Sequence, residues 1–127
     1  MKILIVEDDY KVLDILVDLY NSNIKGYAEV ATTCKKAIQS ALKTKYDLIS
    51  LDFLMPDGNG DEFVKKIRVE GGINKDTPIL VVTGVSDLVQ NKLKDQENIY
   101  ITAKPFTRAK LIEKLEEILG PDVIKKN

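Results

Sequence analysis

Short apolar runs recur along the chain and are separated by longer stretches in which apolar residues return every three or four positions. The short runs predict five strands, at Ile3–Val6, Ala28–Ala31, Leu48–Leu51, Ile79–Val82 and Ile99–Ile101. Strands that are apolar throughout are typical of a parallel sheet whose two faces are both covered by helices.

The longer stretches predict five helices, each with an apolar stripe along one side. The stripe residues are Val12, Leu16 and Leu19; Cys34, Ile38, Ala41 and Leu42; Phe63 and Ile67; Val89 and Leu93; and Leu111, Leu115, Ile118 and Leu119. Ser86 and Thr107 are residue types that favour N-caps, and Gly120–Pro121 is typical of a helix end. The polar segment Asp57–Asp61 predicts a turn followed by a helix cap.

Five strands alternating with five helices predict an α/β sandwich of three layers, with right-handed crossovers between parallel strands. The 127 residues fit one domain. We expect this domain to occupy residues 1–120. A short polar tail, residues 121–127, is expected to follow it and to fray from Asp122 onward.

Composition excludes several classes of function. The 19 basic and 20 acidic residues give a net charge of −1, which favours neither nucleic acid nor an anionic membrane as a direct partner. The longest apolar run is about five residues, far short of the ~20 that span a bilayer, and no signal-peptide pattern is present. Cys34 is the one cysteine, so an internal disulfide cannot form, and we expect a cytoplasmic protein. The absence of histidine excludes a Ser-His-Asp triad and His-ligated zinc.

Acidic residues follow two of the predicted strands. Glu7, Asp8 and Asp9 follow the first strand, and Asp52 follows the third. Sites in such sheets form beyond the carboxyl ends of the strands, so we expect Glu7, Asp8 and Asp52 to converge there. Helix capping is the alternative explanation for the first group. Asp52 lies at the edge of an apolar core, where an unpaired carboxylate is unfavourable.

The charges at these strand ends predict a divalent cation. The three carboxylates supply −3 and Lys104, after the fifth strand, supplies +1, so an ion of charge +2 completes the balance. Oxygen ligands that leave room for water favour Mg²⁺. A carboxylate beside such an ion can attack an electrophilic phosphorus, and Thr83, at the end of the fourth strand, can donate to a phosphoryl oxygen. The alternative for Lys104 is a solvated surface lysine, and the alternative for Thr83 is a hydroxyl that caps the next helix.

In this order and at these separations, the residues resemble the receiver domain of two-component response regulators. The resemblance covers about residues 2–119 and is carried by Glu7–Asp8, Tyr46–Asp52, Met55–Pro56 with Gly60, Thr83–Gly84 and Lys104–Phe106. It implies a flavodoxin-like (βα)5 fold with a five-stranded parallel sheet in the order 2-1-3-4-5.

The resemblance also implies a role for each residue of the site. Asp52 would be the phosphoacceptor, and Thr83 and Lys104 would sense the phosphoryl group. The Mg²⁺ site would consist of Asp8, Asp52, the backbone carbonyl of Leu54 and, mostly through water, Glu7. The Lys104–Pro105 peptide bond would be cis, a geometry to which sequence alone gives a prior of only ~5–6%.

The chain departs from the family pattern in the region that leads to Lys104. The family often has an aromatic switch residue three positions before the lysine, where this chain has Ile101, and the adjacent Tyr100 is expected to point to the other face of the sheet. A Tyr-gated switch is therefore not expected. As a separate departure, the stretch Lys92–Asn98 lacks the small-residue turn that is common before the fifth strand.

Two further positions bear on the lifetime of a phosphoryl group. In the family, the side chains two residues after the phosphoacceptor and two residues after the threonine influence the loss of phosphate. In this chain they are Leu54 and Val85. Neither side chain can hydrogen-bond an attacking water, which predicts slow self-dephosphorylation.

The implied function is a phosphoacceptor signalling switch of a two-component system. A sensor histidine kinase would phosphorylate Asp52, and the surface of the fourth helix, fifth strand and fifth helix would then change to regulate a downstream target protein. Such a protein catalyses only its own phosphorylation and dephosphorylation. A phosphorelay intermediate that passes phosphate to a histidine phosphotransferase is an alternative. We expect a stand-alone domain like a chemotaxis regulator if residue 127 is the true end, and a further output domain if it is not.

Three alternatives belong to other classes of protein. An aspartate-nucleophile phosphatase typically needs a second acid at the position of Leu54. A flavin-binding module needs hydroxyls and glycines after the first strand, where Glu7–Asp9 would repel phosphate. A purely structural interaction domain would not need the complete set of pocket residues.

Overall fold

The structure, a computed structural model, describes residues 1–125; the last two residues of the tail lie outside the described residues. The elements are β1 (Lys2–Val6), α1 (Tyr10–Asn23), β2 (Tyr27–Ala31), α2 (Cys34–Lys43), β3 (Leu48–Leu51), β4 (Leu54–Met55), β5 (Gly58–Asn59), α3 (Gly60–Ile67), β6 (Ile79–Thr83), α4 (Ser86–Lys92), β7 (Ile99–Ala103), α5 (Arg108–Leu119) and the 3-10 helix η1 (Pro121–Val123). Among residues 1–125, no helix combines the length and the apolar composition that crossing a bilayer requires.

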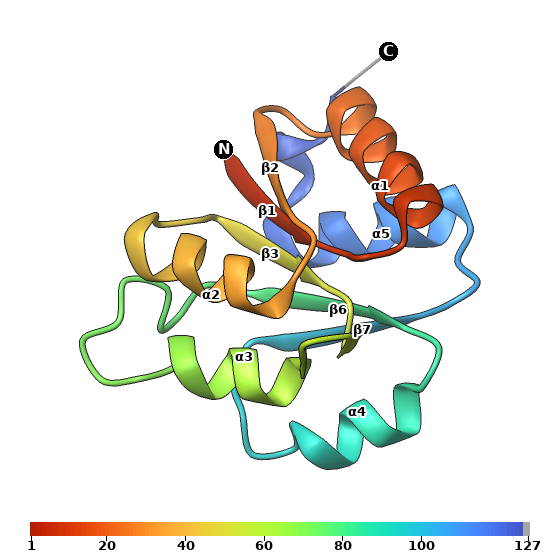
Figure 1. Cartoon of the computed structure of the whole chain (residues 1–127). Helices are drawn as coiled ribbons and strands as arrows, with labels where there is room; N and C mark the ends of the chain where they lie inside the picture. The colour runs from red at the N-terminus through yellow and green to blue at the C-terminus, as the bar shows by residue number, and fades with distance from the viewer. Residues whose placement is uncertain (126–127) are drawn as a thin grey trace.

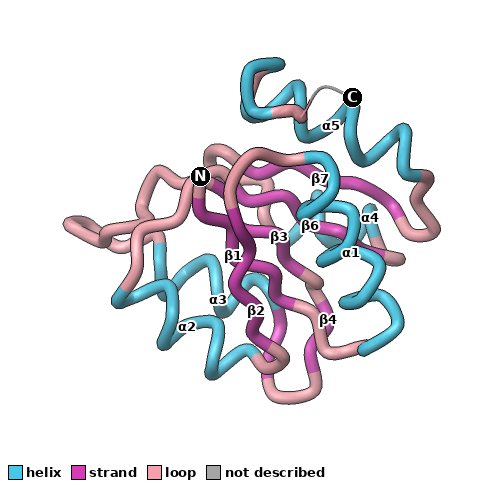
Figure 2. The backbone as a smooth tube through the Cα atoms, turned by 90° about the horizontal axis from the view of Figure 1, so that it is seen from above, coloured by secondary structure: helices cyan, strands magenta, loops and turns pink. Residues whose placement is uncertain are grey.

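Five parallel strands form the central sheet in the order β2-β1-β3-β6-β7. Figure 2 shows these strands side by side. β6 and β7 are the fourth and fifth strands that the sequence predicts, so the predicted order 2-1-3-4-5 is confirmed. The pattern did not predict the small antiparallel hairpin of β4 and β5, which follows β3 directly.

Helices cover both faces of the sheet, as the apolar strands predict. α1 and α5 lie on one face, and α2, α3 and α4 lie on the other (Figure 1). Alternate residues of β1 pack into the apolar layers on opposite faces of the sheet. Leu4 and Val6 pack under α2–α4, and Ile3 and Ile5 pack under α1 and α5. Each is at most 1% exposed, and full burial of such a side chain stabilises the fold by about 1.5–3 kcal/mol.

Two details of the helices differ from the sequence prediction. Leu42 is 52% exposed, because α2 faces the sheet with the small residues Cys34, Ala37 and Ala41 instead. Ser86 is the first residue of α4 and not its N-cap, because the turn at Thr83 already places Val85 in the cap position. The predicted cap at Thr107 is confirmed, since its hydroxyl accepts the Lys110 N–H.

The described part of the tail does not fray. Its backbone returns to the end of α1, where Ile124 forms an antiparallel bridge with Ile24 and the Lys125 N–H donates to the Asn23 carbonyl at 2.7 Å. Ile124 is partly buried against the apolar layer under α1 and α5. Apolar burial and backbone hydrogen bonds therefore hold a segment for which the polar composition of the tail predicted fraying.

Candidate functional site

Backbone hydrogen bonds of the sheet continue past the strand ends and bring the site residues together. The Asp52 N–H donates to the Val6 carbonyl at 2.9 Å, so Asp52 lies beside Glu7. The Lys104 N–H donates to the Thr83 carbonyl at 2.7 Å. The parallel register of β1, β3, β6 and β7 thus carries residues from four strand ends to one edge of the sheet.

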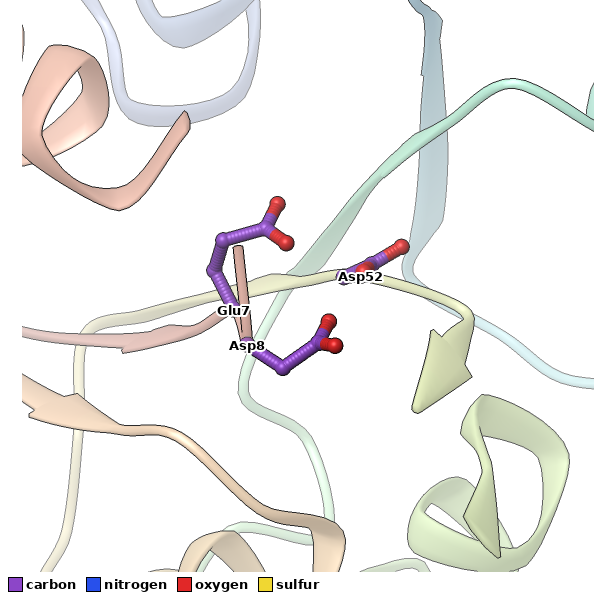
Figure 3. Close-up of side chains that lie close together, drawn as sticks. All are labelled: Glu7, Asp8 and Asp52. Atoms are coloured by element: carbon purple, nitrogen blue, oxygen red, sulfur yellow. The ribbon is translucent and has the colours of Figure 1, made fainter. Parts of the chain in front are cut away.

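Three carboxylates meet at this edge, as the sequence predicts. Glu7, Asp8 and Asp52 each offer an oxygen, and these oxygens all lie within 4.8 Å of one another. Figure 3 shows Glu7 and Asp8 extending from the end of β1 and Asp52 lying at the end of β3. The side chain of Glu7 is only 1% exposed and that of Asp52 is 11% exposed.

The buried Glu7 carboxylate has a partner at each oxygen. Oε1 accepts a hydrogen bond from the Lys104 amino group at 3.0 Å, and Oε2 accepts the Asp9 N–H at 3.2 Å. The same amino group lies 3.7 Å from Asp52 Oδ1. Lys104 is therefore shared between two acids and neutralises only part of their charge.

Asp9 has a separate role. It is the N-cap of α1, and its carboxylate accepts the N–H groups of Lys11 and Val12. The capping interpretation of the first acidic group is therefore correct for Asp9, whereas Glu7 and Asp8 turn toward Asp52. The sequence alone left both explanations open for all three acids.

Electrostatics at Asp52 favour a cation. Burial, followed by the nearby charge of Glu7, raises the pKa of Asp52 to about 7, and the positive charge of Lys104 offsets this only in part. Carboxylate oxygens are the donors that hard divalent ions prefer. The donor set and its charge therefore fit a divalent ion such as Mg²⁺, and Glu7, Asp8 and Asp52 could bind a metal.

Thr83 lies at the end of β6 and is 1% exposed. Its hydroxyl oxygen accepts the Val85 N–H at 3.0 Å, which is a bond within the turn before α4. The alternative in which this hydroxyl caps the next helix is wrong, because α4 has no side-chain cap hydrogen bond. The bond from the Val85 N–H uses an oxygen lone pair and leaves the hydroxyl proton available to another acceptor. A Cβ added to the adjacent Gly84 would meet no atom of residues 1–125 within 4 Å other than those of its two chain neighbours, so the backbone that follows the threonine borders open space.

The other expected positions have these places in the fold. Leu54 begins β4, two residues after Asp52, and its side chain is 47% exposed. The Lys104–Pro105 peptide bond is cis, as the resemblance implies. Tyr100 and Ile101 pack into opposite layers of the sandwich, which confirms the predicted alternation along β7.

Sequence reasoning did not identify the contact made by Asp57. Its carboxylate accepts the backbone N–H groups of Cys34 and Lys35 at 2.8 and 3.0 Å. These bonds join positions 23 and 22 residues apart, so no local pattern could indicate them. The sequence signal was limited to a polar turn after the third strand.

Comparison with known proteins agrees with this geometry. Residues 3–116 match the response regulator receiver domain family. The transcriptional regulatory protein CusR of Escherichia coli K12 is 32% identical over 132 aligned residues, which cover 94% of this chain and 51% of CusR. A chemotaxis protein CheY homolog of Campylobacter jejuni is 48% identical over 71 residues, 54% of this chain and 53% of that protein.

Solved structures show the same fold. The chemotaxis protein CheY4 of Vibrio cholerae has a TM-score of 0.81 and 30% identity, covering 93% of this chain and 98% of CheY4. The receiver domain of the sensor histidine kinase PA1611 of Pseudomonas aeruginosa has a TM-score of 0.80 and 27% identity, covering 94% of this chain and 97% of that domain. That domain holds a magnesium ion in its active-site cleft.

The chain belongs to the response regulator receiver domain family, whose members are signalling switches of two-component systems. It spans about half the length of the regulatory proteins that it matches over most of its residues.

Proposed function

We propose that the protein accepts a phosphoryl group on Asp52 from the phosphohistidine of a sensor histidine kinase or histidine phosphotransferase, with Mg²⁺ bound at the same site. The observation that carries this proposal is the convergence of Glu7, Asp8 and Asp52 around the amino group of Lys104. An excess of negative charge at a strand end is unfavourable unless a cation joins it. Phosphoryl transfer uses such a cation for charge stabilisation.

Asp8, Asp52 and the Leu54 carbonyl would hold the ion, with Glu7 acting mostly through water. When bound, Mg²⁺ would neutralise negative charge on the phosphoryl oxygens. An Asp52 carboxylate oxygen attacks phosphorus: an O–P bond forms, and the P–N bond to the donor imidazole breaks. Catalysis is confined to the protein's own phosphorylation and dephosphorylation.

Lys104 and Thr83 would respond to the new group. A phosphoryl group adds negative charge and strong acceptor oxygens at Asp52. The Lys104 amino group, which now contacts Glu7, would form a charge-assisted hydrogen bond to it, and the Thr83 hydroxyl would donate its proton. Because these residues lie at the ends of β7 and β6, the response would begin on that side of the sheet.

Two grooves support a route from this response to partners. A largely apolar groove of about 390 Å³ is lined by Val12 and Ile15 of α1 and by Lys104–Phe106. It lies beside the Lys104 end of the site and would suit a partner that delivers the phosphoryl group. A second groove of about 370 Å³ between β7 and α5 is lined by Ile101–Ala103, Pro105, Phe106, Lys110, Glu113, Lys114 and Glu117. It lies within the α4, β7 and α5 surface that would regulate a downstream target protein.

The test is incubation of the 127-residue protein with Mg²⁺ and a small acyl phosphate, followed by intact mass measurement. We expect a gain of one phosphoryl group, roughly 80 Da, that depends on Mg²⁺ and is absent from Asp52→Asn. Failure of the native protein to gain this mass would reject the proposal. Continuous release of phosphate from simple phosphoesters would instead indicate an aspartate-nucleophile phosphatase.

A further inference from the structure

The tip of the β4–β5 hairpin is attached to a distant helix. Asp57 lies in the turn between β4 and β5, and its carboxylate accepts the N–H groups of Cys34 and Lys35, the first two residues of α2. The first N–H groups of a helix have no partner within the helix. These two bonds hold the pKa of Asp57 below its ordinary value.

The start of α2 also has a local cap. The Thr33 hydroxyl accepts the Lys36 N–H at 3.1 Å, whereas Asp57 reaches α2 from the turn between β4 and β5. Thr33 therefore caps α2 locally, without any contribution from Asp57. The consequence that only Asp57 adds is a fixed position for the hairpin tip.

The hairpin also approaches α2 closely at Gly58. An added Cβ at Gly58 would lie 3.2 Å from Cys34 Sγ, so the hairpin backbone approaches α2 directly. Pairing of Leu54 with Asn59, and of Met55 with Gly58, links the tip to the residue two positions after the phosphoacceptor. A displacement of the tip would therefore move the Leu54 backbone.

We propose that Asp57 is a positioning residue for the metal site, because it fixes the hairpin that presents the Leu54 carbonyl. This inference rests on the proposed function, in which that carbonyl is a Mg²⁺ ligand. A ligand that is already in place does not have to be ordered when the ion binds. Groups that orient metal ligands typically change metal affinity by 10–100-fold when they are removed.

Calorimetric titration of the metal-free 127-residue protein with Mg²⁺ tests the proposal. We expect Asp57→Ala to raise the dissociation constant about tenfold. Asp57→Asn loses the same charge but retains a side-chain carbonyl acceptor, and we expect it to recover most of the affinity. Thr33→Ala is the matched control, because it weakens the start of α2 without releasing the hairpin, and its affinity should equal that of the native protein.

The variants separate positioning from two simpler effects. Equal weakening in Asp57→Ala and Asp57→Asn would mean that only the charge of Asp57 attracts the ion, and would overturn the proposal. Equal weakening in Thr33→Ala and Asp57→Ala would mean that any damage to α2 suffices, and would also overturn it. A native protein that does not bind Mg²⁺ would reject the proposed function itself, whereas native binding with an unchanged constant in Asp57→Ala would reject only the positioning role.

A second measurement uses Cys34, which is 4% exposed where the hairpin meets α2. Because coupling between two sites is reciprocal, Mg²⁺ should tighten the hairpin on α2 and slow alkylation of this single thiol. We expect Asp57→Ala to be alkylated several-fold faster than the native protein without Mg²⁺ and to lose most of the protection by Mg²⁺. Equal Mg²⁺ protection in both proteins would overturn the proposal.

Discussion

The amino group of Lys104 lies 3.0 Å from Glu7 Oε1, although 97 positions separate these residues in the chain. Glu7 is almost fully buried, and the Lys104 side chain is 25% exposed. The lysine therefore supplies a positive charge to a carboxylate that water cannot solvate. It also lies near enough to Asp52, at 3.7 Å, to respond to any change of charge there.

Replacing Lys104 by alanine should destabilise the Mg²⁺-free protein. We expect a loss of about 1–3 kcal/mol in the free energy of unfolding, because a buried charged acceptor loses its charged donor. Saturating Mg²⁺ should recover most of this loss, since the ion restores positive charge beside Glu7. Urea unfolding with and without Mg²⁺ measures both effects.

The Lys75–Glu70 pair provides the control for Lys104. Its atoms are 2.9 Å apart, but the two side chains are 41% and 93% exposed. Exposed pairs contribute little, so Lys75→Ala should change the free energy of unfolding by less than about 0.5 kcal/mol and should not respond to Mg²⁺. Equal losses in the two variants would contradict the assigned role of Lys104.

Stability without Mg²⁺ should fall as the pH rises toward neutrality. Burial raises the pKa of Asp52 to about 7, whereas an unfolded aspartate has a pKa of about 3.9. The unfolded state therefore releases this proton at a lower pH than the folded state does. The contribution of Asp52 to the free energy of unfolding is fully present below about pH 4 and is lost as the pH rises to about 7. Asp52→Asn should remove this slope and stabilise the Mg²⁺-free protein at pH 8 by about 1–2 kcal/mol.

The metal should act in the opposite direction on Asp52. Binding of a cation requires the carboxylate form, so Mg²⁺ affinity should weaken as the pH falls below about 7.

Urea unfolding at pH 5, 6, 7 and 8, without Mg²⁺, for the native protein and Asp52→Asn would measure how the free energy of unfolding changes with pH. Parallel pH profiles for the two proteins would contradict the raised pKa.

Gly60 and Gly84 should respond differently to the same substitution. A Cβ on Gly60 would lie 2.7 Å from Cδ1 of the buried Phe53 ring, so we expect Gly60→Ala to cost about 1–3 kcal/mol through overpacking. A Cβ on Gly84 would meet no atom of residues 1–125 within 4 Å outside its two chain neighbours, so Gly84→Ala should change stability by less than about 0.5 kcal/mol. Thermal and urea unfolding of the two variants measure this difference.

Gly84→Ala should still affect the chemistry. Its methyl group would occupy the space beside Thr83 into which we expect a phosphoryl group to fit, so phosphorylation by a small acyl phosphate should slow. A normal phosphorylation rate in Gly84→Ala would show that this space is not used.

A phosphoryl group on Asp52 should be lost slowly. Leu54 is half-exposed at the site and Val85 packs against the layer under α2–α4, and neither side chain can orient a water for attack on phosphorus. Leu54→Asn should shorten the half-life of the phosphorylated protein about tenfold or more by supplying a polar group. The loss of phosphate in Mg²⁺ buffer, followed by intact mass, measures this half-life.

Leu42 is a matched control for Leu54. It is exposed to a similar extent, 52% against 47%, but it lies near the C-terminal end of α2. Leu42→Asn should therefore leave the half-life unchanged. A half-life of seconds in the native protein, or equal effects of the two substitutions, would contradict the expected role of the apolar residue at position 54.

Some features of the site could be predicted because they depend on the chain near a strand end. Asp52 and Thr83 each adjoin an apolar run, and the carboxyl ends of parallel strands share one edge of the sheet. The tail could not be predicted in this way. Ile124 is held by a bridge to Ile24, a partner 100 positions away, and no local pattern in the sequence indicates that partner.

The pattern of apolar residues by itself determined the layered α/β fold. Continuous apolar runs predict strands that are covered on both faces, and apolar residues that return every three or four positions give each helix one face that avoids water. The strand-end acids and Lys104 determined the charge that the site would carry. Tertiary structure decided which acid serves which purpose: Asp9 caps α1, Glu7 pairs with Lys104, and Asp57 binds the start of α2. The physical reason is that a carboxylate accepts from whatever donor folding places within about 3 Å of it, and for Glu7 and Asp57 that donor lies far away in the sequence.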